Sequence, residues 1–384
     1  MMPVSPASGV TAGASPAVNR FRCPGLALTT FDHGRLAELH LTLTPLPGER
    51  WSDACRRLHS VLRDEGATVV NQLVFGHVAA RDDAMAGLKR EFGGLNWPVT
   101  WTEGAALTDG RWAGMQVWAV RGLPVEPLEN GGVIFACQYR DEHARRAWLG
   151  AIGPDDLNPP KPAQAARTFE RLEAALADAG LNMSHLVRTW LFLDDILAWY
   201  GDFNKVRTEF FRSRRLFDTL LPASTGVGTR NPRRAAVALT ALAMQSVSGR
   251  PVVREIASPA QCPATSYGSS FSRAVELTWG RCRQVIVSGT ASIEPGGKSA
   301  RPNDLAGQIE LTFDVVGDIL KSRDLDFANT TRAVAYFKDA SGARVFAEWL
   351  ARRGLRDLSV VSTVAAVCRD ELLFELELDA ATST

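Results

Sequence analysis

Alternating apolar and polar positions near the end of the chain predict a strand with two unlike faces. In "CRDELLFELELDA", residues 368–380, every second position from Leu372 to Leu378 is apolar, and the positions between and beyond them include Glu375, Glu377 and Asp379. Side chains alternate across a strand with period two, so the apolar face would pack into a core. The carboxylates would then either face water, as on many antiparallel sheets, or line a cleft.

A longer pattern repeats along the chain with a constant spacing. The segment "QAARTFERLEAALADAGLNMSHLVRTWLFLDD" from Gln164 aligns without a gap with "QIELTFDVVGDILKSRDLDFANTTRAVAYFKD" from Gln308, a shift of 144 residues. Each copy begins with apolar residues at helical spacing and continues into a run that is typical of a strand. An internal repeat of this kind predicts consecutive units of one fold.

Each unit is predicted to be α+β, with helices on one face of a sheet. A second helical stretch and further apolar strands follow each copy, and a degenerate copy, "DACRRLHSVLRDEGATVVNQLVFG", lies in front of them. Three such units would close around their bare sheet faces as a pseudo-trimer, with clefts at the junctions. We therefore divide the chain into a disordered tail (1–22), a degenerate unit (23–125), a middle unit (126–250) and a last unit (251–384).

The composition predicts a small-molecule ligand rather than a nucleic acid or a membrane. The 384 residues include 43 Lys+Arg and 42 Asp+Glu, so the net charge of +1 gives no electrostatic reason to expect either partner. The start of the chain is rich in Pro, Ala, Ser and Gly and lacks the apolar core of a signal peptide. Six cysteines are scattered singly, which favours a reducing compartment, and we expect a cytoplasmic protein.

The chemistry available in the last unit comes from carboxylate, thiol and arginine groups. All six histidines lie at or before position 185, and the sequence has no H-E-x-x-H motif, Walker loop or G-x-G-x-x-G after a strand. We therefore expect no metal and no cofactor. Glu375 would have a raised pKa if its face of the strand lined a closed cleft. Cys368 precedes it by seven positions, and a lone cysteine is more often a small buried apolar residue than a reactive one.

Two loops could meet a ligand. "SYGSSFSRAVEL", residues 266–277, gathers hydroxyl groups, aromatic rings and Arg273, and "LPASTGVGTRNP", residues 221–232, places small residues where a backbone can approach a ligand closely. Taken alone, residues 266–277 are better explained as a polar loop that leads into a strand, and residues 221–232 are equally compatible with a plain connecting loop.

The segments "VRTWLFLDD", "FNKVRTEFF" and "LPAST" resemble the YjgF/Rid imine deaminase family, whose small subunits assemble as trimers with sites between subunits. The resemblance implies the same Rid/YjgF-like, chorismate mutase-like fold for each unit. The substrate arginine of that family is expected after "LPA", where this chain has Ser224, and its glutamate is missing from "AVALTAL" in the middle unit. These differences disfavour imine hydrolysis.

The chain resembles the chorismatase family more closely, over residues 35–380. The resemblance is strongest in "FNKVRTEFF", "LPASTGVG", "YGSSFSRA", "VSGTASIEPGG" and "CRDELLFELELDA". It implies that Glu375 is the catalytic acid and that Cys368 marks the branch that forms 3-hydroxybenzoate. The candidates for substrate binding are Arg273, Arg207, Tyr267, Ser272 and Gly226.

The resemblance implies an enzyme, a lyase or hydrolase, that cleaves chorismate to pyruvate and 3-hydroxybenzoate in secondary metabolism. A protonated Glu375 would donate its proton to the terminal methylene carbon of the enolpyruvyl ether, without a cofactor. The alternatives are hydrolysis to a dihydroxycyclohexadiene carboxylate, mixed 3- and 4-hydroxybenzoate formation, a Rid-type deaminase, or a metabolite-binding protein without catalysis. The protein would be a monomer or a low-order oligomer.

Overall fold

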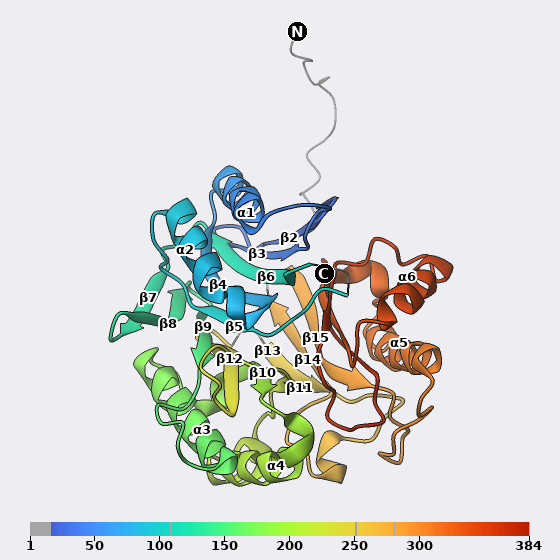
Figure 1. The fold of residues 1–384 in the computed structure, drawn as a ribbon. Coiled ribbons are helices and arrows are strands. Elements are labelled where there is room, and N and C mark those ends of the chain that lie inside the picture. Colours follow the sequence, from blue (N-terminus) through green and yellow to red (C-terminus); the bar gives the residue numbers. More distant parts are fainter. Residues whose placement is uncertain (1–16, 108–109, 250–251, 280, 384) are drawn as a thin grey trace.

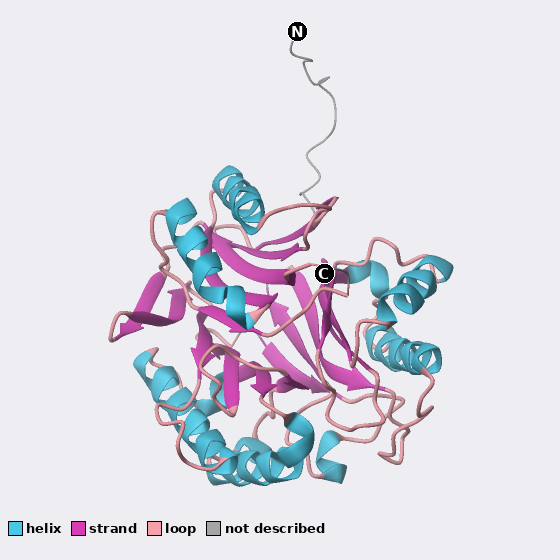
Figure 2. Cartoon of the chain, in the orientation of Figure 1, coloured by secondary structure: helices cyan, strands magenta, loops and turns pink. Residues whose placement is uncertain are grey.

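Three six-stranded sheets follow one another along the chain (Figure 1). The structure is a computed structural model, and it describes residues 17–107, 110–249, 252–279 and 281–383. Helices cover the outer face of each sheet, and the opposite faces turn toward the centre of the molecule (Figure 2). The predicted α+β class and the arrangement of three repeated units as a pseudo-trimer are confirmed.

The first sheet has the strand order β1-β2-β3-β6-β4-β5. Its elements are β1 (Val18–Cys23), β2 (Leu26–Asp32), β3 (Ala37–Leu43), α1 (Trp51–Glu65), β4 (Thr68–Gly76), η1 (Val78–Ala80), α2 (Arg81–Phe92), β5 (Val99–Thr102) and β6 (Trp112–Arg121). Residues 1–16 of the expected disordered tail lie outside the described residues. From Val18 onward the expectation differs from the structure, because β1 pairs in antiparallel fashion with β2 along its whole length.

The second sheet has the order β11-β10-β12-β9-β8-β7, and the third has the order β13-β14-β15-β18-β16-β17. The second unit contains β7 (Glu126–Asn130), β8 (Val133–Arg140), β9 (Ala144–Ile152), α3 (Lys161–Asp178), η2 (Met183–His185), β10 (Leu186–Leu193), α4 (Ile196–Ser213), η3 (Leu216–Asp218), β11 (Ala223–Gly228) and β12 (Val237–Ser246). The third contains β13 (Val252–Ile256), η4 (Ala264–Tyr267), β14 (Ala274–Trp279), β15 (Cys282–Ala291), α5 (Leu305–Lys321), η5 (Phe327–Asn329), β16 (Thr330–Phe337), α6 (Gly342–Arg352), β17 (Val360–Val364) and β18 (Phe374–Ser383).

The spacing seen in the sequence persists in the fold. Helix α3 begins at Lys161 and α5 at Leu305, while β10 begins at Leu186 and β16 at Thr330, each pair 144 residues apart. Both helices bury an apolar stripe on their own sheet, because apolar residues recur on one helix face. The repeat therefore fixes the same helix-on-sheet packing twice.

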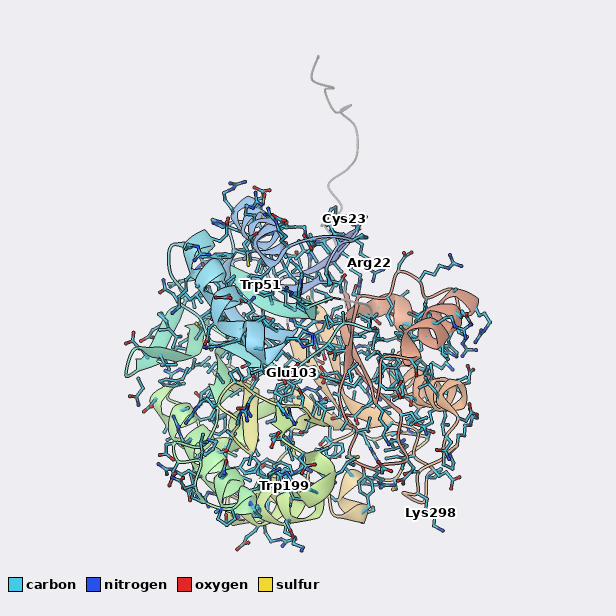
Figure 3. The ribbon with its side chains drawn as sticks, in the orientation of Figure 1. Arg22, Cys23, Trp51, Glu103, Trp199 and Lys298 are labelled. Carbon is cyan, nitrogen blue, oxygen red and sulfur yellow. The ribbon has the colours of Figure 1, made fainter. Side chains whose placement is uncertain are left out.

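The three sheets contact one another through polar as well as apolar groups. Gln116 of the first unit donates to the Ala333 carbonyl of the third at 3.2 Å, and Thr100 of the first unit bonds Thr240 of the second at 2.6 Å. At the edge of the first sheet, the Arg22 guanidinium donates to Ser359 of the third unit (Figure 3). One continuous core with residues from all three units fills the space between the inner faces.

Strand β18 has the two faces that its sequence predicts. Phe374, Leu376 and Leu378 are fully buried on the helix side, and Glu375, Glu377 and Asp379 on the opposite face are also buried. The carboxylate face therefore does not meet open water. The strand begins later than predicted, since residues 368–373 form a turn in which the Leu372 amide donates to the Arg369 carbonyl. No helix within the described residues is long and apolar enough to cross a bilayer.

Candidate active site

The position of Glu375 occurs once in each unit, but it carries a carboxylate in the third unit alone. Glu375 lies opposite Tyr336 in the β16–β18 pair. The repeat places Ala238 at the same position opposite Phe192, and Gly114 opposite Phe75. Of these three equivalent positions, one in each unit, the one in the third unit carries a carboxylic acid and the other two do not.

Glu375 reaches a cavity of about 250 Å³ between the second and third units. Helix α4 and strand β11 form one wall, and the loop before β14, the end of β15 and the turn before β18 form the other. The lining residues are Tyr200, Gly201, Asn204, Arg207, Ser224, Gly226, Tyr267, Ser269, Phe271, Arg273, Gly289, Ala291, Ile293, Cys368, Arg369 and Glu375.

The cavity brings together six of the seven candidate site residues from the sequence. They are Glu375, Cys368, Arg273, Arg207, Tyr267 and Gly226. Ser272 is the exception, because it is fully buried and does not line the cavity. Its hydroxyl donates to the Leu221 carbonyl at 2.7 Å, and its backbone pairs with Ala223 in a parallel bridge. Ser272 therefore joins the two units, and the structure does not place it in the cavity with the other candidates.

Glu375 is held in its protonated form at neutral pH. Burial raises its pKa to about 8, and the nearby charge of Glu377 adds to the rise, while Arg188 and Arg273 oppose it. Gly289 of β15 lies against this carboxyl group, since a Cβ atom added at position 289 would collide with its Oε1 atom. The Glu375 carboxyl group therefore packs directly against the backbone of Gly289, which has no side chain.

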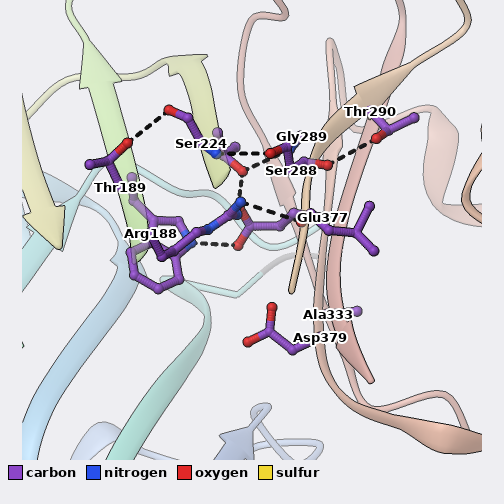
Figure 4. A network of polar contacts seen from close by, with 12 residues as sticks. Arg188, Thr189, Ser224, Ser288, Gly289, Thr290, Ala333, Glu377 and Asp379 are labelled. Carbon is purple, nitrogen blue, oxygen red and sulfur yellow. Dashed lines mark hydrogen bonds and ion pairs between the residues drawn. The ribbon is translucent and has the colours of Figure 1, made fainter. Parts of the chain in front are cut away.

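Glu377, two residues further along the same face of β18, is ionised instead. It accepts a hydrogen bond from Arg188 Nη2 at 2.7 Å (Figure 4). It also accepts from Trp190 Nε1 at 2.9 Å and pairs with Arg332. Burial opposes its ionisation, but the charges of Arg332 and Arg188 hold the pKa of Glu377 below its ordinary value. Two neighbouring carboxyl groups with pKa values pushed apart are the arrangement that separates a proton donor from a fixed charge.

Three guanidinium groups line the cavity, and within the described part of the chain none of them forms an ion pair with a carboxylate. Arg207 is buried, donates to Asn204 Oδ1 at 2.7 Å, and has an Nε atom without a partner. Arg273 donates twice to the Cys262 carbonyl, each time at 3.0 Å. Arg369 donates to the Gly297 carbonyl at 2.9 Å. Cations with spare donors suit an anionic ligand.

Both Arg273 and Arg369 lie over one aromatic ring. Their guanidinium carbons are 5.2 Å and 5.8 Å from the centre of the Tyr267 ring. The ring attracts both cations and keeps them close to each other at the side of the cavity. Tyr267 thus shapes the cation-rich wall.

Cys368 is a neutral thiol in this cavity. Burial, followed by the charge of Glu375, raises the pKa of Cys368 to about 12. Tyr200 also lines the cavity, and burial, followed by the charge of Cys368, raises its pKa as well. The thiol of Cys368 and the phenol of Tyr200 therefore carry their protons at neutral pH and meet a ligand as uncharged groups.

Several lining residues escaped the sequence reasoning. Tyr200 and Asn204 precede Arg207 by seven and three residues on α4, which puts all three on one helix face. That spacing was a usable signal once Arg207 was a candidate. Arg369 follows Cys368 directly, whereas Ser269 and Phe271 lie in the loop that also supplied Arg273.

Known proteins with similar sequences and structures support the fold of the chain. The model of the family described as endoribonuclease L-PSP, the Rid/YjgF repeat, matches residues 150–247. A 3-hydroxybenzoate synthase of Streptomyces hygroscopicus is 29% identical over 236 residues, which cover 54% of this chain and 65% of that relative. A crystal structure of a chorismatase matches with a TM-score of 0.61 at 19% identity, over 82% of this chain and 93% of the other.

These matches support the fold class of the chain, which is a pseudo-trimer of Rid/YjgF-like units. They also confirm the resemblance to the chorismatase family. Within the described residues, no group of three or more His, Cys, Asp or Glu side chains could hold a metal ion.

Proposed function

We propose that the protein cleaves chorismate and releases pyruvate. The observation that carries the proposal is a protonated carboxyl group, Glu375, in a cavity that also holds three guanidinium groups without carboxylate partners. Chorismate has two carboxylates, which Arg207 on one wall and Arg273 or Arg369 on the other can bind. The resemblance to a 3-hydroxybenzoate synthase supports the same substrate.

The chemistry begins with the proton of Glu375. Its transfer to the terminal methylene carbon of the enolpyruvyl ether gives an oxocarbenium ion, and the Glu375 carboxylate left behind balances the charge. No group beyond the side chains of the cavity takes part in this step.

The second step decides the product. If the neighbouring ring hydroxyl displaces the ether oxygen, pyruvate leaves, an epoxide forms, and the hydroxyl proton returns to Glu375. Opening of the epoxide with loss of a ring proton then gives 3-hydroxybenzoate. We assign proton handling in this opening to the neutral thiol of Cys368, which lines the cavity beside Glu375. If water takes the place of the ring hydroxyl, the product is a dihydroxycyclohexadiene carboxylate.

Incubation with chorismate tests the proposal, with pyruvate measured by a coupled lactate dehydrogenase assay. The wild type should release pyruvate, and Glu375→Gln should do so on the order of a hundredfold more slowly, because the amide has no proton of suitable acidity. Ligand binding without pyruvate release by the wild type would assign the protein to metabolite binding instead. Near-normal turnover in a folded Glu375→Gln variant would remove the carboxyl group from the mechanism.

A further inference from the structure

Thr225 connects the fixed charges at the centre of the molecule to the backbone beneath the catalytic acid. It is a buried residue of β11 that does not line the cavity. Its Oγ1 atom accepts from Arg188 Nη2 at 2.5 Å and from the Gly289 amide at 3.0 Å. Because Arg188 Nη2 also donates to Glu377, this oxygen joins the Arg188–Glu377 pair to the Gly289 amide.

The Gly289 end of this connection lies against Glu375. Position 289 has no room for a Cβ atom because the Glu375 carboxyl occupies that space. A displacement of the Gly289 peptide would therefore move the surface that supports the acid. Figure 4 shows Gly289 and Ser288 above the dashed line that joins Arg188 to Glu377.

The junction between the first and second units contains the same link without the charges. Thr100 lies opposite Leu73 in the β4–β5 pair, as Thr225 lies opposite Trp190 in the β10–β11 pair. Its Oγ1 accepts from the Ala151 amide at 2.7 Å, but its side-chain partner is Thr240 rather than an arginine.

The third junction lacks the link. Val361 lies opposite Val334 in the β16–β17 pair, at the position of the two threonines. Its methyl groups fill the space beside Gly114. A threonine-to-amide bond thus belongs to two junctions, whereas a bond from that threonine to an arginine paired with a carboxylate belongs to the junction with the acid.

We propose that Thr225 is a positioning residue for the reaction, which fixes the Gly289 peptide relative to the Arg188–Glu377 pair and thereby holds the Glu375 carboxyl in its reactive place. This inference rests on the proposed function. Thr225 acts through Gly289 and Arg188 and does not touch the substrate. A loss of its hydroxyl should therefore lower kcat and leave KM nearly unchanged.

Three variants of the full chain test the inference by steady-state pyruvate release from chorismate. Thr225→Val keeps the shape and removes the hydroxyl, and kcat should fall on the order of ten- to a hundredfold, as expected when a reacting group is misplaced. Thr225→Ser keeps Oγ1 and should restore most of the rate. Thr100→Val is the matched control, because it removes the same backbone link from a junction without an acid, and its kcat should equal that of the wild type.

A readout that needs no turnover separates this inference from the proposed function. The carboxylic acid stretching band of Glu375, identified by its loss in Glu375→Gln, should shift in the infrared spectrum of Thr225→Val and keep its place in Thr100→Val. If the wild type releases no pyruvate, the proposed function fails, and the band still reports whether Thr225 positions the acid. An unchanged band in Thr225→Val would overturn the inference.

Two kinetic results would also contradict it. Equal losses of kcat in Thr225→Val and Thr100→Val would show that the threonines only pack the junctions. A loss in Thr225→Ser as large as that in Thr225→Val would show that the methyl group matters and the hydroxyl does not. If Thr225→Val does not fold, the comparison of Thr225→Ser with Thr225→Ala decides between the same two explanations.

Discussion

At the scale of single residues, the charge state of Glu375 follows from what surrounds it. Burial and Glu377 favour the protonated form, and Arg188 and Arg273 favour the ionised form. The other titratable groups that interact with it are Cys368, Tyr200 and Tyr336, each with a pKa raised by burial. The result is an acid with a pKa of about 8.

The rate of pyruvate release should therefore fall at alkaline pH. Glu375 must carry its proton to act as the donor, so the active fraction is complete well below pH 8 and declines as the pH rises through the pKa of about 8. A pH profile of kcat/KM checks this, since it reports groups of the free enzyme. A rate that is constant up to pH 10 would contradict the assignment of Glu375.

Cys368 should influence the product more than the rate. Alanine cannot pass a proton, so Cys368→Ala should still release pyruvate but form less 3-hydroxybenzoate and more of the non-aromatic diene acid. Chromatography of the reaction mixture measures the ratio of hydroxybenzoate to pyruvate. Cys282→Ala, a buried thiol at the start of β15 outside the cavity, is the control. An unchanged ratio in Cys368→Ala would show that this thiol only packs.

At the scale of elements, the approach of β15 to β18 leaves room for glycine at position 289. In Gly289→Ala the new methyl group would collide with the Glu375 carboxyl. We expect pyruvate release to fall on the order of a hundredfold with the fold intact, because the acid is displaced. Gly296→Ala is the control, since a Cβ atom there has open space around it. Full activity in Gly289→Ala would show that the carboxyl can move without cost.

From the sequence, the strand face on which a residue lies could be predicted better than the contacts that its side chain makes. The period-two pattern assigned Glu375 and Leu376 to opposite faces of β18, and both assignments are confirmed. The same reasoning could not tell that the hydroxyl of Ser272 turns to Leu221 rather than to the cavity, because that depends on a bridge to another unit. Strand β18 also begins later than predicted, because residues 368–373, which the sequence pattern assigned to the strand, form a turn.

At the scale of the whole molecule, the repeat predicted three units with clefts between them, but it could not rank the junctions. The junction between the second and third units holds the carboxylate, whereas Ala238 and Gly114 take its position elsewhere. Those equivalences follow from strand register, which needs the paired strands. The sequence also gave no sign that Arg188 of one unit would pair with Glu377 of another, since 189 residues separate them.

The free energy of unfolding of the whole protein should fall as the pH rises, because the buried Glu375 then loses its proton. A group whose pKa is higher in the folded state stabilises the fold most below its unfolded pKa, and this contribution disappears as the pH rises through the folded pKa. For Glu375 the window runs from 4.5 to about 8, and the loss is on the order of a few kcal/mol.

Glu375→Gln removes this dependence because glutamine does not ionise. We expect its melting temperature to change less between pH 5 and pH 9 than that of the wild type, so that the inactive variant is relatively more stable in alkali. Glu348→Gln, at a half-exposed position on α6, is the control and should follow the wild type. Scanning calorimetry across the pH range measures the difference. Parallel curves for the wild type and Glu375→Gln would mean that the cavity does not hold Glu375 protonated, and the acid of the proposed reaction would then lack its proton at neutral pH.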